Sequence, residues 1–377
     1  SNDIYPVSAD STLPFEQHRD IFYLSGIDQE ESILVLFPDS KKNSFKEMLF
    51  IRETNDHITH WEGEKLTKEK AKDISGINNI YWTNEFENIL IQIIKQSNNV
   101  YINTNEHYRQ NVETQTREDR FIEKLKKIGG INFKKSNPIL QKQRSIKDEI
   151  EIKLIEHACE ITRKGFERIL KFVKPGVWEY EIEAEFSHEF LKNRSKKFAY
   201  SPIIASGRNS NFLHYIENNR QCLDGEIVLM DVGAEYANYS SDMTRTVPVN
   251  GKFSDRQKII YNAVLNVKNE ANKILRPGTS IDKYHKEIAK IMESELLDIK
   301  LIDKTDIKNQ NPKNPAYKRY FMHGTSHHLG LDVHDVGNFY EDVKAGNVFT
   351  IEPGIYIKEE SLGVRLEDDI LVGNNNN

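Results

Sequence analysis

The sequence predicts a two-domain protein, with an α/β domain over residues 1–144 and an α+β domain of two similar halves over residues 145–377. Three observations predict this architecture. The chain has 377 residues, a length that favours two domains or more. Its first part alternates short apolar runs with helical patterns, as α/β domains do. Its second part repeats an order of helices, glycines and carboxylates, which indicates a pseudo-twofold domain.

The first domain is expected to form short strands and helices around its own core. Apolar runs predict strands at residues 32–37, 48–52 and 100–103, and helical spacing predicts a helix at residues 86–94. Residues that carry chemistry are sparse in this part of the chain. We therefore expect a structural or assembly role for it.

The second domain is expected to begin with a long helix over residues 145–173. Ser145 followed by Asp148 is similar to a capping box, although Asp replaces the usual Glu. A broad apolar face follows, and Lys174-Pro175-Gly176 is a typical stop signal.

An internal repeat covers the rest of this domain. A further helix is expected at residues 179–193, and a second pair of helices at 254–276 and 281–297. Residues 224–233 then parallel residues 345–354, because each segment has a carboxylate six residues after one glycine and two before the next. Each copy returns through another acidic segment. The repeat thus singles out four carboxylates: Asp231, Asp242, Glu352 and Glu367.

These four acids are expected to share one metal site. An unpaired carboxylate buried beside an apolar strand costs several kcal/mol, and four together repel one another. Two divalent cations would balance their charges. Oxygen ligands with one nitrogen ligand suit Mn, Fe, Co or Zn. The nitrogen ligand is expected from the histidines of residues 323–335, and the remaining imidazoles, with His214, are candidates to bind substrate or move protons.

Composition argues against several classes of partner. The 52 basic and 58 acidic residues give a formal charge of −6, which argues against nucleic acid as the main partner. No apolar stretch reaches the ~18 residues that a membrane-spanning helix needs. Two cysteines, Cys159 and Cys222, are too few for a disulfide scaffold, so we expect a cytoplasmic protein with no membrane partner.

The motifs and their order resemble the aminopeptidase P family of pita-bread metallopeptidases. The matching segments are Leu213-His-Tyr215, Asp231-Val-Gly233, Asp242-Met-Thr-Arg-Thr246, His323-Gly-Thr-Ser-His327, His334-Asp-Val-Gly337, Ile351-Glu-Pro-Gly-Ile-Tyr356 and Gly363-Val-Arg-Leu-Glu367. Residues 8–11 and 19–26 are similar to that family's smaller N-terminal domain, so the resemblance covers nearly the whole chain. By this resemblance, we expect a short leading segment of that domain to be missing here.

The resemblance implies a creatinase-like N-terminal domain, a pita-bread catalytic domain and a metal-dependent Xaa-Pro aminopeptidase. Its substrates would be peptides with proline at position two, and it would form a dimer or tetramer. The implied metal ligands, holding two divalent ions with Mn preferred over Co, Zn or Fe, are Asp231, Asp242, His327, Glu352 and Glu367. The implied catalytic residues are His214, His323, His334 and Glu352. The implied substrate-binding residues are His214, His334, Tyr356 and Arg365.

Two further residues have alternative interpretations. Trp61 matches a tryptophan that reaches a neighbouring subunit's site in some relatives, and it is equally interpreted as a partly exposed aromatic of the small domain. His328 follows the implied ligand and is expected to be a surface or packing residue.

Three rival functions share the fold. The nearest is a prolidase, which cleaves Xaa-Pro dipeptides with the same site. Thr325-Ser326 before His327, and residues 331–333 after it, are more similar to aminopeptidase P. The others are a metal-free hydrolase like creatinase and a pita-bread binding module, both of which have lost metal ligands that this sequence retains.

Overall fold

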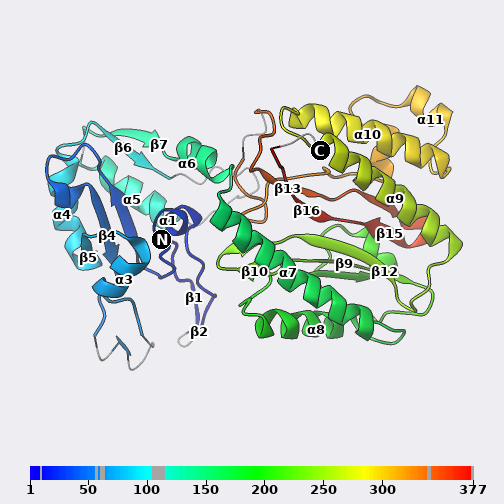
Figure 1. Ribbon diagram of the computed structural model, residues 1–377, viewed down its shortest axis with the longest axis horizontal. Coiled ribbons are helices and arrows are strands. Elements are labelled where there is room, and N and C mark those ends of the chain that lie inside the picture. Colours follow the sequence, from blue (N-terminus) through cyan, green and yellow to red (C-terminus); the bar gives the residue numbers. More distant parts are fainter. Residues whose placement is uncertain are drawn as a thin grey trace. The chain divides into compact units, whose positions relative to one another are not determined.

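The structure is a computed structural model that describes residues 1–8, 11–55, 58–59, 64–103, 115–128, 130–337 and 341–374. It contains two compact units, Ser1–Leu140 and Gln141–Asn377 (Figure 1). The domain boundary that we place before residue 145 stays a prediction. Trp61 lies outside the described residues. Within them, no helix combines the length and the apolar character needed to cross a membrane.

The N-terminal unit has the mixed α/β character that the sequence predicts. Its central sheet has the order β3-β4-β5, with β3 and β4 antiparallel and β4 and β5 parallel. The strands and helices of this unit are β1 Pro6–Ser8, β2 Ser11–Thr12, α1 Arg19–Ser25, β3 Ile33–Leu36, β4 Glu47–Ile51, α3 Lys68–Ser75, β5 Ile80–Trp82, α4 Phe86–Ile94, β6 Asn99–Ile102, α5 Arg117–Lys126 and β7 Asn132–Lys135.

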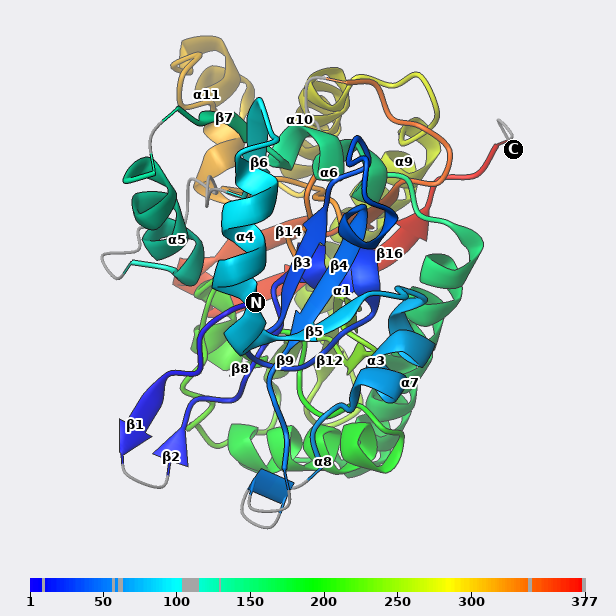
Figure 2. The same ribbon diagram turned by 90° about the vertical axis from the view of Figure 1, so that its left-hand side faces the viewer.

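Strand β4 supplies the core of this unit on both faces of the sheet. Met48 and Phe50 pack with the apolar face of α4, whereas Leu49 and Ile51 pack with Ala71 of α3. Successive strand residues point to opposite faces, which is why helices lie on both sides of the sheet (Figure 2).

The C-terminal unit consists of two halves, each with a pair of helices and antiparallel strands. The first half comprises α7 Glu149–Phe172, α8 Glu179–Lys192, β8 Ile203–Ser206, β9 Ile227–Val232, β10 Glu235–Tyr236, β11 Tyr239–Ser240 and β12 Met243–Pro248. The second half comprises α9 Asp255–Ile274, α10 Ile281–Asp298, α11 Lys304–Asn309, β13 Val348–Ile351, β14 Gly354–Ile357, β15 Leu362–Arg365 and β16 Asp368–Leu371. The short helix α6 Asn137–Arg144 precedes them.

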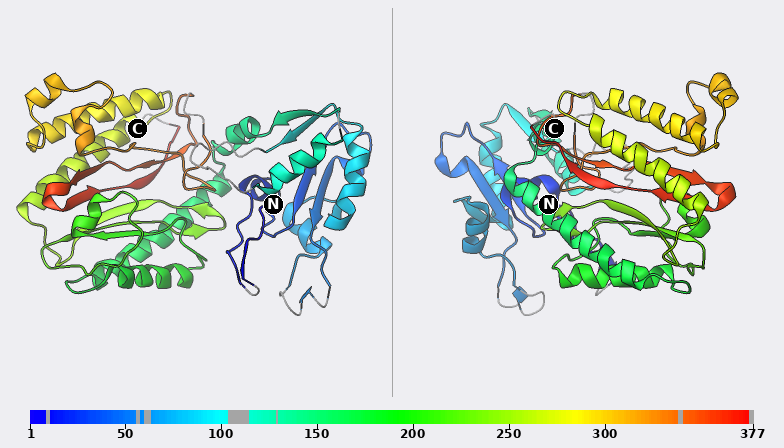
Figure 3. Two further views of the ribbon diagram at one scale, coloured as in Figure 1. Left: turned by 180° about the vertical axis from the view of Figure 1, so that it is seen from behind. Right: turned by 45° about the vertical axis from the view of Figure 1, so that its right-hand side comes forward.

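The internal repeat predicted from the sequence corresponds to these two halves. Strand β9 pairs antiparallel with β12, and β13 pairs antiparallel with β16 in the same way. The two helix pairs lie on opposite sides of the strands, so that the strands of both halves are enclosed between them (Figures 1 and 3). The pseudo-twofold, pita-bread organisation is therefore confirmed.

The start of the long helix differs from the prediction. Helix α7 begins at Glu149, and its N-cap is Asp148, whose side chain accepts from the backbone N–H groups of Ile150 and Glu151. The Glu151 carboxylate accepts in return from the N–H of Asp148 at 3.0 Å, which completes a standard capping box. Ser145 instead follows α6, and its hydroxyl donates to the Lys142 carbonyl.

Candidate metal centre

The side chain of Asp231 lies on the face of β9 that points away from helices α7 and α8. In β9, Val228 and Met230 join the core that α7 and α8 cover, while Leu229 lies in a separate cluster with Tyr356 of β14. Asp231 is two residues after Leu229 and therefore shares its face. Asp242 comes one residue before β12, next to Asp231, because Thr244 is the register partner of Asp231.

The second pair of carboxylates lies at matching places in the other half. Glu352 directly follows β13, and Glu367 directly precedes β16. Ile351 and Asp368 are register partners, so the two acids leave neighbouring strand ends together. His327 runs alongside β13, where its carbonyl accepts from the N–H of Thr350 at 3.0 Å.

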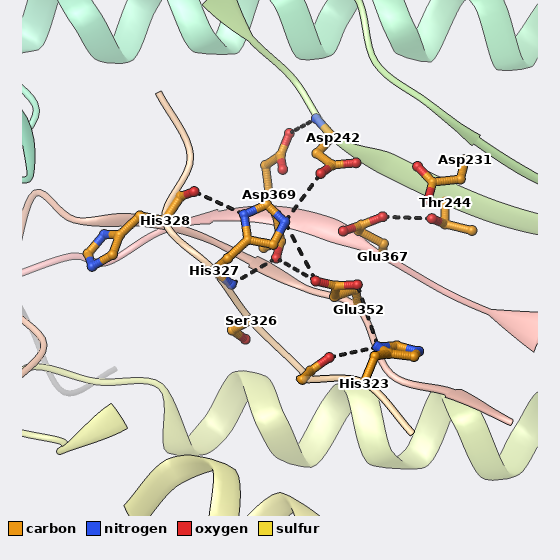
Figure 4. A network of polar contacts seen from close by, with 12 residues as sticks. Asp231, Asp242, Thr244, His323, Ser326, His327, His328, Glu352, Glu367 and Asp369 are labelled. Carbon is orange, nitrogen blue, oxygen red and sulfur yellow. Dashed lines mark hydrogen bonds and ion pairs between the residues drawn. The ribbon is translucent and has the colours of Figure 1, made fainter. Parts of the chain in front are cut away.

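Side chains from both halves converge on one small volume (Figure 4). One ligand atom from each of Asp242, His327 and Glu367 lies within 4.8 Å of the other two, and all three residues are buried. The Nε2 atom of His327 is 3.4 Å from Asp242 Oδ2 and 3.5 Å from Glu352 Oε1. The structure thus contains a candidate metal-binding cluster built from both halves.

The acids of this cluster destabilise one another's charged forms. Burial raises the pKa of Glu367 well above its usual value, and the charges of Asp242 and Glu352 raise it further. Burial likewise raises the pKa of Asp231, and that of Glu352 to about 7. Carboxylates so crowded either take up protons or require a compensating cation.

His327 compensates part of this negative charge. Burial lowers its pKa, but the hydrogen bond to Asp242 and the charges of Glu352 and Asp242 raise it to about 9 overall. One imidazolium and the Arg365 guanidinium, which pairs with Asp231, cannot neutralise four acids. Carboxylate oxygens with one imidazole nitrogen are a donor set that fits hard or borderline divalent cations, so the residues present fit a metal site.

A chain of polar groups extends from Asp231 to His323 through the buried side chains of Arg365 and Tyr356. Arg365 donates to Asp231 Oδ2 at 2.5 Å and to the Tyr356 hydroxyl at 2.9 Å. The hydroxyl of Tyr356 is 2.8 Å from His323 Nε2, and His323 Nδ1 is 3.7 Å from Glu352 Oε2. Burial, with a further contribution from Arg365, lowers the pKa of His323 to about 3, so its imidazole is neutral.

The other two sequence-predicted histidines are exposed. The ring of His334 stacks beside that of His327, with centroids 3.9 Å apart. His214 lies in the segment after the short helix Gly207–Asn211, between Leu213 and Tyr215, which pack with Tyr356. Both rings are therefore near the cluster and open to solvent. His328, by contrast, is buried against Phe349 with centroids 4.1 Å apart, which is the expected packing role.

Three residues that contact the acidic residues of the site were not predicted as site residues from the sequence. Thr244 donates to Glu367 Oε2 at 2.6 Å, and Asp369 accepts from the backbone N–H of Asp242 at 2.9 Å. Tyr200 places its hydroxyl 2.5 Å from Asp231 Oδ1 and 2.6 Å from Asp242 Oδ1. Asp369 could have been predicted from the sequence, because it lies two residues after Glu367 and residues at that spacing share one face of a strand.

No local pattern marks Tyr200. It follows no apolar period, and it reaches the site because Phe198 bridges to Ala234, just beyond β9. A phenol carries one proton and can donate to only one of the two carboxylates at a time. We therefore interpret Tyr200 as a hydrogen-bonding support that orients Asp231 and Asp242.

Replacing Tyr200 by Phe is expected to lower divalent-metal affinity about 10- to 100-fold, the usual loss when a partner of a ligand is removed. The fold should persist, because the ring remains. Metal titration of the apoprotein, followed by calorimetry, measures this change. Tyr236→Phe is a matched control, because its ring packs on His157 instead. Unchanged affinity in Tyr200→Phe would contradict the supporting role.

Comparison with known proteins matches both units of the chain. Residues 153–374 match the model described as metallopeptidase family M24, and residues 1–101 match the aminopeptidase P N-terminal domain. The chain is 35% identical to a Haemophilus influenzae Xaa-Pro aminopeptidase over 378 residues, which covers 96% of this chain and 84% of the relative. An Escherichia coli Xaa-Pro aminopeptidase is 34% identical, with 98% and 87% covered.

A solved structure resembles the whole chain. It is Escherichia coli aminopeptidase P with the inhibitor Pro-Leu, which is 32% identical and superposes with a TM-score of 0.87. The match covers 98% of this chain and 87% of that one. The likeness therefore extends over both units and is not confined to the candidate site.

Proposed function

Because the chain belongs to the aminopeptidase P family of M24 metallopeptidases, we propose that its carboxylate cluster is the active site of a Xaa-Pro aminopeptidase. The enzyme would release the N-terminal residue from peptides with proline at position two. The observation that carries this proposal is the buried cluster of Asp242, His327 and Glu367 within a chain that matches such an enzyme over 98% of its own length.

We propose a dinuclear site, with manganese as the preferred metal and cobalt, zinc or iron as alternatives. Its ligands would be Asp231, Asp242, His327, Glu352 and Glu367, of which Asp242, His327 and Glu367 form the buried cluster. Two such cations lower the pKa of a water nucleophile and polarise the scissile carbonyl. The raised pKa values of the acids support this assignment, because a cation relieves their mutual repulsion.

Glu352 is proposed to accept the proton of the attacking water. Its two oxygens lie 3.5 Å from His327 Nε2 and 3.7 Å from His323 Nδ1, so it faces the cluster and a neutral imidazole together. A carboxylate placed beside the proposed metal site, where the attacking water would lie, suits general base catalysis. His323 is proposed to take part in this proton transfer as a neutral imidazole: its Nδ1 lies 2.8 Å from the Gly324 carbonyl and therefore carries the ring N–H that faces Glu352, while Nε2 accepts from the Tyr356 hydroxyl.

His214 and His334 are proposed to contact the substrate. Both are exposed beside the cluster, where their N–H groups can donate to the peptide carbonyl as negative charge develops on its oxygen. Arg365 and Tyr356 are proposed to line the pocket. Since both are buried and bonded to each other, they would form its rigid wall.

A metal-assisted site suits the Xaa-Pro bond. The amide before proline is tertiary and has no N–H, so a peptidase cannot recognise that group by a hydrogen bond. Polarisation of the carbonyl and contact with the pyrrolidine ring do not need the missing donor.

Substrate length separates this proposal from a prolidase. We expect Ala-Pro-Ala to be hydrolysed with a kcat/KM at least about tenfold above that of Ala-Pro, a difference of about 1.4 kcal/mol in transition-state stabilisation. Ala-Ala-Ala is the control for the proline requirement. A strong preference for Ala-Pro would assign the site to a prolidase instead.

We further propose a cytoplasmic homo-oligomer, a dimer or tetramer, with no nucleic acid or membrane partner. Cys159 and Cys222 are both free thiols, which suits a reducing compartment. The retained acids and imidazole argue against a metal-free hydrolase or a binding module, since both would dispense with them.

A further inference from the structure

A second buried carboxylate, separate from the metal cluster, organises the segment that carries His214. Glu179 is the first residue of α8 and is fully buried, with 0% of its surface exposed. No cation contacts it directly among the described hydrogen bonds and ion pairs. A buried charge of this kind requires hydrogen bonds from all sides.

Both oxygens of Glu179 are fully engaged. The Oε1 atom accepts from the N–H of Ser206 at 2.7 Å, from its hydroxyl at 2.8 Å and from the Asn209 amide at 3.3 Å. The Oε2 atom accepts from the Tyr215 hydroxyl at 2.7 Å and from the N–H of Arg220 at 2.9 Å. All these donors belong to residues 206–220, the segment that contains His214.

This segment has little regular structure: beyond Ser206, the last residue of β8, only the short helix Gly207–Asn211 lies within it. Asn218 and Ser210 also hold it, because they accept from the backbone N–H groups of Ile204 and Gly363. Gly207 has φ +49°, and a Cβ there would lie 2.4 Å from Glu226 Oε1, so the chain turns tightly against that side chain. Glu226 in turn holds the Arg220 guanidinium by two contacts of 2.6 and 2.7 Å.

Tyr215 links the carboxylate to His214. Its ring is buried in the cluster with Leu229 and Tyr356, and its hydroxyl donates to Glu179. His214, the residue before it, is exposed. The Tyr215 side chain is therefore held in the interior, while the side chain of His214, the residue before it, lies at the surface.

We propose that Glu179 is a positioning residue for His214: it fixes residues 206–220 and so sets where the imidazole meets the substrate. This inference rests on the proposed function of His214. In the described contacts, Glu179 does not touch any of the proposed metal ligands or substrate-binding residues. Its effect on turnover must therefore pass through the segment that it holds.

A double-mutant cycle tests the inference with the full-length, metal-loaded protein and Ala-Pro-Ala. Glu179→Gln keeps the shape of the side chain, but it replaces one carboxylate oxygen by an NH2 group. That group is a hydrogen-bond donor and would face the N–H and O–H donors that the oxygen now accepts from. We expect kcat/KM to fall about 10- to 100-fold, as for a small misplacement of a catalytic group, with metal content unchanged. In a His214→Ala background, Glu179→Gln should cause almost no further loss, because both changes remove the same contribution.

Tyr215→Phe is the milder second variant, used if Glu179→Gln does not fold, and it should show the same non-additivity. Glu30→Gln is the matched control. It is also buried, and its carboxylate accepts from Arg52 at 3.0 Å and from Lys65 at 2.6 Å, but it lies in the N-terminal unit, which carries no proposed catalytic residue. Its kcat/KM should stay within about twofold of the unmodified protein.

The outcomes separate this inference from the proposed function. If the unmodified protein does not cleave Ala-Pro-Ala, the proposed function is wrong. If it does cleave, but Glu179→Gln and His214→Ala lower kcat/KM independently, so that their factors multiply, the positioning role is wrong. Loss of metal in Glu179→Gln would also overturn it, since the effect would then act on the cluster.

Discussion

The Asp242→Ala protein should fold, but it should bind divalent metal at least about 100-fold more weakly than the unmodified protein. It should not release the N-terminal alanine of Ala-Pro-Ala above the background rate. The two carboxylate oxygens of Asp242 contact different partners in the cluster. Its Oδ2 lies 3.4 Å from His327, and its Oδ1 lies 2.6 Å from the Tyr200 hydroxyl. Without it, Glu367 and His327 lose the oxygen that completes their site.

The fold should survive this change, because removing one of several buried acids relieves repulsion. Metal analysis after dialysis, turnover of Ala-Pro-Ala and thermal unfolding measure the three effects. Asp224→Ala is the matched control in the same half of the unit, since this exposed carboxylate bonds only to Asn250 among the described contacts. Full activity in Asp242→Ala would refute the proposed metal site.

Glu352→Gln should lower kcat by about a hundredfold to ten-thousandfold while keeping much of the bound metal. The amide retains an oxygen that can act as a ligand. It cannot accept the proton of the attacking water, which is the role we propose for Glu352. Because substrate contacts are left in place, KM should change much less than kcat.

Steady-state kinetics with metal analysis of the same sample tests this second prediction. Glu360→Gln is its control. That residue lies on the surface turn between β14 and β15, where it pairs with Arg256. A kcat within a few-fold of the unmodified enzyme would remove Glu352 from the catalytic role. Complete loss of metal would reassign it as a ligand alone.

Much of the fold follows from local patterns in the sequence. Apolar runs marked strands such as β9 and β13, because strands buried on both faces need continuous hydrophobic residues. Acidic residues at the same spacing from flanking glycines indicated the internal repeat, and the repeat predicted the four carboxylates. The start of α7 was misplaced by four residues. Both Ser145 and Asp148 are good N-caps, and only Asp148 has a Glu three residues later to complete the capping box.

The sequence by itself therefore determined the two halves, the four acids and the imidazole-rich segment, since these depend on composition and spacing along the chain. The tertiary structure decided which groups support them. Tyr200 reaches Asp231 across 31 positions, Arg365 reaches Asp231 across 134, and Glu179 reaches Tyr215 across 36. Such contacts arise from strand pairing and packing between distant segments, and a hydroxyl or carboxylate carries no periodic signal of the partner that it will meet.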